Sequence, residues 1–168
     1  RLRHVPVLLT HVLEFLARPQ AVFIDGTVGD GGHAEALLEA SGTASRLLGM
    51  DLDASALERA RVYLKKFGSR ADFVHESFVH IERVAREHGV RNVTGILFDL
   101  GMSTRHLDVE RGFSFHSTGA LDMRFDASGQ RVLPHPDHPA LQRLARKTTS
   151  YTAADVVNTL SAADLASL

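Results

Sequence analysis

Short apolar runs alternate with helical patterns through the N-terminal part of the chain, and this alternation limits the possible folds more than any other feature. Strands that alternate with helices predict an α/β fold, in which a parallel sheet carries helices on both faces. In such sheets, ligands bind beyond the carboxyl ends of the strands. We expect strands at 21–25, 46–51, 72–75 and 93–100, and helices at 32–39, 54–67, 79–88 and, near the N-terminus, around 8–16.

A glycine-rich segment, Asp25–His33 (DGTVGDGGH), joins the first expected strand to the helix that follows it. Its glycines allow the backbone to turn sharply and to approach a ligand closely. A phosphate-binding P-loop needs Lys-Ser/Thr after the last glycine, where this chain has His33-Ala34. A dinucleotide-binding loop fits better, since GDGGHA matches G-x-G-x-x-A and Asp51 follows about 20 residues later.

The acids around this loop favour a cationic ligand over a dinucleotide. Asp25 ends the first strand and Asp30 lies within the loop, whereas a pyrophosphate prefers a helix N-terminus without neighbouring carboxylates. S-adenosylmethionine carries a sulfonium centre and an ammonium group, which an acid ahead of the glycines suits. Asp51 ends the second strand and suits the ribose of either cofactor. A tight turn that binds nothing is the third interpretation.

Composition limits the classes of partner. The 168 residues have a formal net charge of −1, so the domain as a whole lacks a basic surface for nucleic acid, although a local patch remains compatible with RNA. Cysteine is absent, which excludes disulfides and thiolate metal sites. No apolar run approaches the roughly 18 residues of a membrane span. His135 and His138 lie among prolines without a carboxylate at ligand spacing. We therefore expect neither a metal nor a membrane partner.

The pattern changes after Leu100. The residues that follow have no regular repeat of apolar positions. Prolines and basic residues come next, and a helical pattern returns at Thr152. We expect three parts: a core with its active-site loop at 1–126, a basic, exposed, partly mobile insertion at 127–150, and the start of a helical segment at 151–168.

Several short motifs occur together in the order and approximate spacing of one known family. They are HVPVLL (4–9), GGH (31–33), GMDLD (49–53), DLG (99–101), LD (107–108), RGFSF (111–115), LDMR (121–124) and TAADVVN (152–158). On these motifs the chain resembles the MraW/RsmH family of methyltransferases, which modify N4 of a cytidine in small-subunit ribosomal RNA. The resemblance implies a Rossmann-like fold, S-adenosylmethionine as cofactor and ribosomal RNA of the small subunit as partner.

The same resemblance implies further properties. Full-length members continue with a helical insertion and more core strands, so we expect this chain to be an N-terminal part that is truncated before the later strands. We expect the protein in the cytoplasm of a bacterium or in the mitochondrial matrix of a eukaryote. Where the family usually has Gln, this chain has His106, which can still make a polar contact. The implied cofactor contacts are Gly31, Gly32, His33, Asp51, Phe78, Asp99 and His106.

Asp99, at the end of the fourth expected strand, is the candidate catalytic residue. A cytosine amino group is a poor nucleophile because its lone pair is delocalised into the ring. A carboxylate that accepts one N–H would localise this lone pair as the new bond forms. Asp99 is placed to do this or to hold the cofactor; the alternative is a strand-end Asp that caps the next turn.

The aromatic residues have two interpretations each. Phe113 and Phe115, together with Arg111 and Arg124, are candidates for stacking on and clamping a flipped nucleotide. Two phenylalanines at this spacing are equally typical of a loop that plugs into a core. Phe78 is a candidate for stacking on adenine, or it packs at the start of a helix.

Two other functions remain open at this point. A non-catalytic ribosome assembly factor could keep the methyltransferase fold and bind RNA without transferring a methyl group. An oxidoreductase with this loop would instead bind NAD and ignore S-adenosylmethionine.

Overall fold

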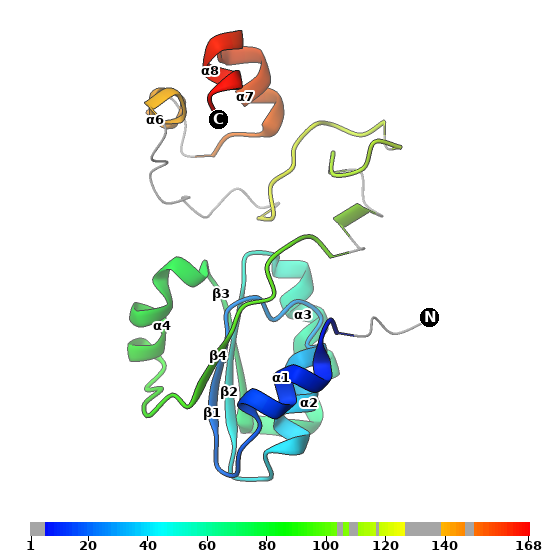
Figure 1. Ribbon diagram of the computed structural model, residues 1–168, viewed down its shortest axis with the longest axis vertical. Coiled ribbons are helices and arrows are strands. Elements are labelled where there is room, and N and C mark those ends of the chain that lie inside the picture. The colour runs from blue at the N-terminus through cyan, green and yellow to red at the C-terminus, as the bar shows by residue number, and fades with distance from the viewer. Residues whose placement is uncertain (1–5, 104–105, 108–110, 117, 127–138, 147–149) are drawn as a thin grey trace. The chain divides into compact units, whose positions relative to one another are not determined.

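The computed structural model describes residues 6–103, 106–107, 111–116, 118–126, 139–146 and 150–168 (Figure 1). The chain divides into two units, Arg1–Leu100 and Gly101–Leu168. In the part of the chain that is described, no helix is long and apolar enough to cross a membrane.

Four parallel strands form the sheet of the first unit, in the order β3-β2-β1-β4. The first three strands follow one another outward and β4 crosses back to pair with β1, so the strand order reverses at β1. This is the Rossmann-like arrangement, and the α/β prediction is confirmed. Ligands bind at such a reversal, beyond the carboxyl ends of the strands. The strands are β1 (Val22–Asp25), β2 (Arg46–Asp51), β3 (Ala71–His75) and β4 (Gly95–Leu97).

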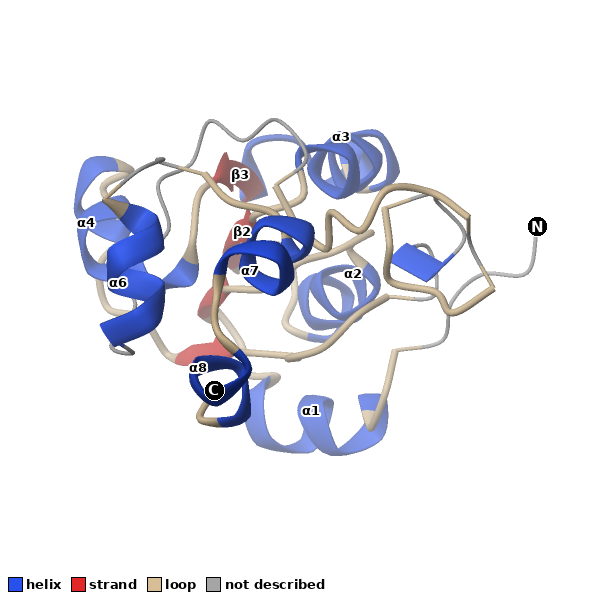
Figure 2. Cartoon of the chain, turned by 90° about the horizontal axis from the view of Figure 1, so that it is seen from above, coloured by secondary structure: helices blue, strands red, loops and turns tan. Residues whose placement is uncertain are grey.

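Helices cover both faces of this sheet (Figures 1 and 2). Alternate residues of β1 and β2 point to opposite faces, so Phe23 and Leu47 join one apolar cluster while Ile24 and Leu48 join the other. The first cluster packs against α1 (Leu9–Leu16), α2 (Gly32–Ala40) and α3 (Ala54–Tyr63), and the second against α4 (Ile81–Glu87).

The expected helix at 54–67 is divided in two. Asp53 caps α3 by accepting hydrogen bonds from the N–H groups of Ser55 and Ala56. The α-helix ends at Tyr63, and a 3₁₀ segment, η1 (Lys65–Arg70), follows. Its Gly68 has φ 57°, a left-handed conformation that stops a regular helix. A second 3₁₀ turn, η2 (Phe78–His80), leads into α4.

Arg70 fastens the end of η1 to the loop after α2. Its guanidinium donates hydrogen bonds to the carbonyl oxygens of Leu38 at 2.8 Å, Gly42 at 2.6 Å and Ser45 at 2.9 Å. The last carbonyls of a helix lack partners inside the helix. Arg70 therefore satisfies the C-terminal end of α2 and fixes the turn that leads into β2.

Replacing Arg70 with alanine is expected to lower the free energy of unfolding by about 2 kcal/mol, because charged hydrogen bonds are lost and the carbonyls lose their donor. Urea unfolding followed by circular dichroism measures this change. Arg86→Ala is the matched control, since Arg86 pairs with exposed Glu82 on the same helix, and such pairs contribute little. Equal unfolding midpoints for the two variants would contradict the role of Arg70.

The second unit carries the short helices α6 (Pro139–Ala145), α7 (Ala153–Thr159) and α8 (Ala162–Ala166). Thr152 and Asp155 form a reciprocal capping box at the start of α7, which agrees with the helical pattern predicted from Thr152. The range 127–150 was expected to be exposed. Helix α6 lies within it, and two of its residues, Ala140 and Leu144, are buried. Residues 127–138 and 147–149 lie outside the described residues.

The LDMR segment is tied to α7. The carbonyls of Leu121 and Asp122 accept hydrogen bonds from the N–H groups of Ala154 and Ala153, at 2.9 and 2.8 Å. These N–H groups belong to the first turn of α7 and have no partner within the helix. This link joins the LDMR segment to α7 within the second unit, Gly101–Leu168.

Candidate functional site

Three carboxylates gather at the carboxyl ends of the neighbouring strands β2, β1 and β4. Asp25 ends β1, Asp51 ends β2, and Asp99 follows β4. Asp25 is buried, with 2% of its surface exposed, and Asp51 is half-buried. The Asp99 side chain is 46% exposed. The reversal of strand order brings these acids together at the place where a ligand is expected.

Burial raises the pKa of Asp25 from 3.8 to about 7. The hydrogen bond from the N–H of Thr27, at 3.1 Å, lowers this pKa in part. The negative charges of Asp51 and Asp99 raise it further. A cation bound among these carboxylates would favour the ionised form of Asp25.

The glycine loop closes onto Asp51. Its carboxylate accepts one hydrogen bond from the N–H of Gly29, at 2.8 Å, and another from the N–H of Asp53, at 2.9 Å. Gly29 and Gly31 have φ values of 53° and 89°, a backbone conformation in which L side chains are strained. A Cβ at Gly31 would also lie 2.8 Å from the side chain of Leu64. The loop and the Asp51 carboxylate therefore hold each other in place.

Asp30, the acid inside the loop, is directed to α3. Its carboxylate pairs with the guanidinium of Arg59 at 2.7 Å. This cation balances the charge of Asp30, and Asp25, Asp51 and Asp99 are the acids at the strand ends.

Asp99 is positioned from two sides. Its backbone N–H donates to the hydroxyl of Thr27 at 2.7 Å. Its carboxylate lies 3.6 Å from Nε2 of His33, which is buried in the first turn of α2. Gly32, just before His33, is packed so closely that a Cβ there would lie 2.7 Å from the ring of Pro6. The predicted residues Gly31, Gly32, His33, Asp51 and Asp99 are thus brought together by the first unit.

Phe78 lies at the same end of the sheet. Its ring meets the ring of Phe98 edge-on, with centroids 5.2 Å apart. Phe98 also packs over Gly26, where a Cβ would lie only 2.3 Å from its ring. The packing interpretation of Phe78 accounts for this contact, and stacking on adenine stays a prediction.

His106 lies in the second unit, inside an aromatic cluster. Its ring centroid is 5.5 Å from that of Phe113 and 5.0 Å from that of Phe125, and the two phenylalanines are 5.3 Å apart. His106 is 8% exposed and Phe113 is 9% exposed. A cofactor contact from His106 stays a prediction.

Three of the four residues of the expected nucleotide clamp make contacts within the protein. Phe113 belongs to the buried cluster, so the core-plug alternative holds for it. Arg111 donates hydrogen bonds to the carbonyls of Arg124 and Phe125. Arg124 makes a two-point ion pair with Asp122, at 2.7 Å for each bond, which lowers the pKa of that carboxyl. These side chains hold the loop together, and a contact with a nucleotide stays a prediction.

The pattern of the MraW methylase family matches residues 1–132. The chain belongs to this family. The chain is 44% identical over 167 residues to "Ribosomal RNA small subunit methyltransferase H" of Thermobifida fusca, and this match covers 96% of the chain and 44% of that protein. The protein of the same name from Syntrophobacter fumaroxidans is 43% identical over 169 residues, covering 99% and 47%. The chain thus spans less than half the length of these relatives.

A solved rRNA methylase from Streptococcus thermophilus overlaps with 64% of this MraW-family chain and 62% of its own length, at 18% identity and a TM-score of 0.45. The family match includes the whole first unit and ends before α6. The alignments with the two curated relatives also include nearly all of the second unit.

Sequence reasoning missed two residues that shape the site of this family member. Thr27 supplies the hydroxyl that fixes Asp99, and its place two residues after the strand-end Asp25 is a signal for such a turn. Phe98 supports Phe78. The sequence signal for Phe98 is weaker, because an aromatic residue in a strand is usually assigned to the core.

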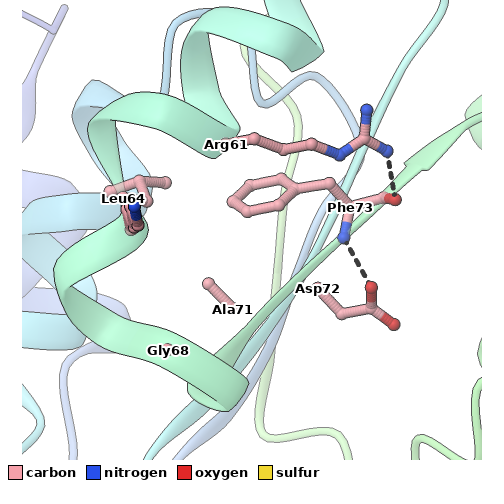
Figure 3. A pocket seen from close by; sticks show the side chains of 7 residues that line it. Arg61, Leu64, Gly68, Ala71, Asp72 and Phe73 are labelled. Atoms are coloured by element: carbon pink, nitrogen blue, oxygen red, sulfur yellow. Dashed lines mark hydrogen bonds between the residues drawn. The ribbon is translucent and has the colours of Figure 1, made fainter.

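An open pocket of about 300 Å³ lies elsewhere, on the outer side of β3 (Figure 3). There the carbonyl of Phe73 accepts a hydrogen bond from Arg61 at 2.9 Å, and its N–H donates to Asp72 at 2.8 Å. None of Asp25, Asp51 and Asp99 lines this pocket, so it is not part of the carboxylate site. In the described ranges, no group of three or more His, Asp or Glu side chains could hold a metal ion.

Proposed function

We propose that this chain binds S-adenosylmethionine at the carboxyl ends of β1 and β2 and forms part of a methyltransferase that acts on small-subunit ribosomal RNA. The observation that carries the proposal is the carboxylate cluster around a closed glycine loop, in a chain of the MraW methylase family. The names of the curated relatives support the RNA substrate.

The residues present fit this cofactor better than a dinucleotide. Asp25, Asp51 and Asp99 offer negative charge to the ammonium and sulfonium groups, whereas a pyrophosphate would be repelled. The Asp51 carboxylate holds the glycine loop through the N–H groups of Gly29 and Asp53, and a carboxylate has the acceptor chemistry that a ribose hydroxyl requires. When bound, the cofactor supplies an electrophilic methyl group.

Asp99 is the residue that we propose to contact the methyl acceptor. We propose N4 of a cytidine as that acceptor, on the basis of the family motifs. The exposed Asp99 carboxylate can accept an N–H of the amino group, which localises the lone pair and stabilises the developing positive charge. Thr27 and His33 hold Asp99 in place, so this contact costs little rearrangement.

Titration calorimetry and methyl transfer test the proposal. The full-length protein is expected to bind S-adenosylmethionine in preference to NAD, and to transfer a tritiated methyl group to small ribosomal subunits that lack the modification. Mass spectrometry of the digested RNA is expected to show N4-methylated cytidine. RNA binding without transfer would instead indicate an assembly factor, and binding of NAD alone would indicate an oxidoreductase.

Replacing Asp51 with alanine is expected to weaken the binding of S-adenosylmethionine by about 10- to 100-fold, since a hydrogen bond to a charged group contributes roughly 1.5–3 kcal/mol. Calorimetry on the folded variant measures this change. Asp30→Ala is the control, because this loop acid is directed to Arg59 and its removal is expected to leave the affinity unchanged. Equal affinities of the two variants would remove Asp51 from the binding site.

A further inference from the structure

The RGFSF segment carries two phenylalanines with opposite exposure. Phe113 is 9% exposed, and Phe115 is 105% exposed, more than any other large apolar side chain among the described residues. Water around an apolar ring is unfavourable. The two rings lie in one short segment, so the contacts of that segment decide which ring is buried and which is exposed.

The base of the segment is braced on several sides. The carbonyl of Arg111 accepts a hydrogen bond from the N–H of Met123 at 2.8 Å, and the Arg111 side chain donates to the carbonyl of Phe125 at 2.5 Å. Gly112 has φ 79°, and a Cβ there would lie 2.8 Å from the carbonyl oxygen of Ala120. A side chain at this position would therefore push the two parts of the loop apart.

Phe115 lies two residues after Phe113, and its side chain is exposed. Phe113 anchors the preceding part by packing on the aromatic cluster. Beyond it, the N–H of His116 donates to the hydroxyl of Ser114 at 3.2 Å, which closes a local turn around Phe115. The exposed ring of Phe115 thus belongs to a segment that packing and hydrogen bonds hold in place. A group held in this way loses less conformational freedom when it binds than one on an unbraced loop.

We propose that Phe115 is a stacking platform for an unpaired base of an RNA strand. This inference rests on the proposed function, in which the substrate is ribosomal RNA. Single-stranded RNA is recognised by aromatic rings that stack on its bases, and an enzyme that modifies a base must reach it outside the helical stack. The loop arginines are engaged with carbonyls and with Asp122, so a flat apolar face is what this tip offers.

Binding of full-length protein to a fluorescein-labelled single-stranded RNA, copied from the decoding region of small-subunit ribosomal RNA, tests the platform. Phe115→Ala is expected to weaken binding by about 5- to 150-fold, the loss associated with one base stacked on one aromatic residue. Phe115→Leu is expected to lose most of the same affinity, because it keeps an apolar side chain without a flat ring. Phe115→Trp is expected to retain the affinity of the wild type.

Phe15→Ala is the matched control, because Phe15 on α1 is 71% exposed and is expected to leave RNA binding unchanged. The melting temperature, the oligomeric state and the affinity for S-adenosylmethionine are expected to be the same in every Phe115 variant and the wild type. A fall in melting temperature or a dissociated oligomer in Phe115→Ala would show that protein covers the ring, and would overturn the proposal.

Two further outcomes separate this inference from the proposed function. A wild type that binds and methylates RNA, with Phe115 variants that bind equally well, would overturn the platform and leave the methyltransferase in place. A wild type that neither binds nor methylates RNA would overturn both.

Discussion

Replacing Asp99 with asparagine is expected to lower the rate of methyl transfer by about 10²–10³-fold, far more than it weakens the binding of S-adenosylmethionine. The hydrogen bond to Thr27 comes from the backbone N–H of residue 99 and survives the change. The amide has the size of the carboxylate and keeps one acceptor. It loses the negative charge that stabilises the acceptor amine as positive charge develops on it.

Single-turnover methylation in the full-length enzyme, with calorimetry for the cofactor, separates the two effects. Asp72→Asn is a suitable control, since Asp72 lies at the outer edge of β3, away from the carboxylate site. A normal rate for Asp99→Asn would make Asp99 a turn cap. A loss that weaker cofactor binding explains entirely would make it a binding residue only.

Replacing Asp25 with asparagine is expected to raise the free energy of unfolding above pH 7, by up to about 4 kcal/mol. In the folded chain the pKa of Asp25 is raised from 3.8 to about 7, mainly by burial. The folded state therefore binds this proton more tightly than the unfolded state. Asp25 contributes stability below pH 3.8, and that stability is lost as the pH rises to about 7.

Asparagine keeps the acceptor for the N–H of Thr27 and cannot ionise, so its stability lacks this dependence. Urea unfolding from about pH 4 to pH 8 is expected to show nearly equal stabilities at the acidic end and a growing advantage of Asp25→Asn toward the basic end. Parallel curves would mean that Asp25 ionises normally. The stabilised variant is expected to bind the cationic cofactor more weakly, because the site has lost one of its three acids.

The sheet was predictable because its inner strands are short and mostly apolar before the acids that end them. The interval 46–51 coincides with β2, and 21–25 exceeds β1 by one residue. Strand β4 is shorter than the expected 93–100. Beyond its carboxyl end, the N–H of Asp99 donates to the hydroxyl of Thr27. The apolar pattern of the sequence does not show this contact, so the end of the strand could not be predicted from it.

The positions of the acids were predictable from the ends of the strands, but their ionisation and partners were not. Asp25 and Asp30 look alike in the sequence, yet one is buried with a raised pKa and the other pairs with Arg59. Phe113 and Phe115 are also alike in type and spacing. The cluster of Phe113 with His106 and Phe125 decides which ring is buried, and the spacing of the two phenylalanines does not show this cluster.

The side chains at the outer edge of β3 affect how the chain behaves while it folds. An unpaired strand edge is a template on which another chain can add a strand. At Phe73 both backbone groups are already occupied, by Arg61 from α3 and by the adjacent Asp72. An incoming strand would have to displace both before it could pair. This protection needs only the docking of α3 beside β3, two neighbours in sequence, so it can form early, when misassembly between chains is most damaging.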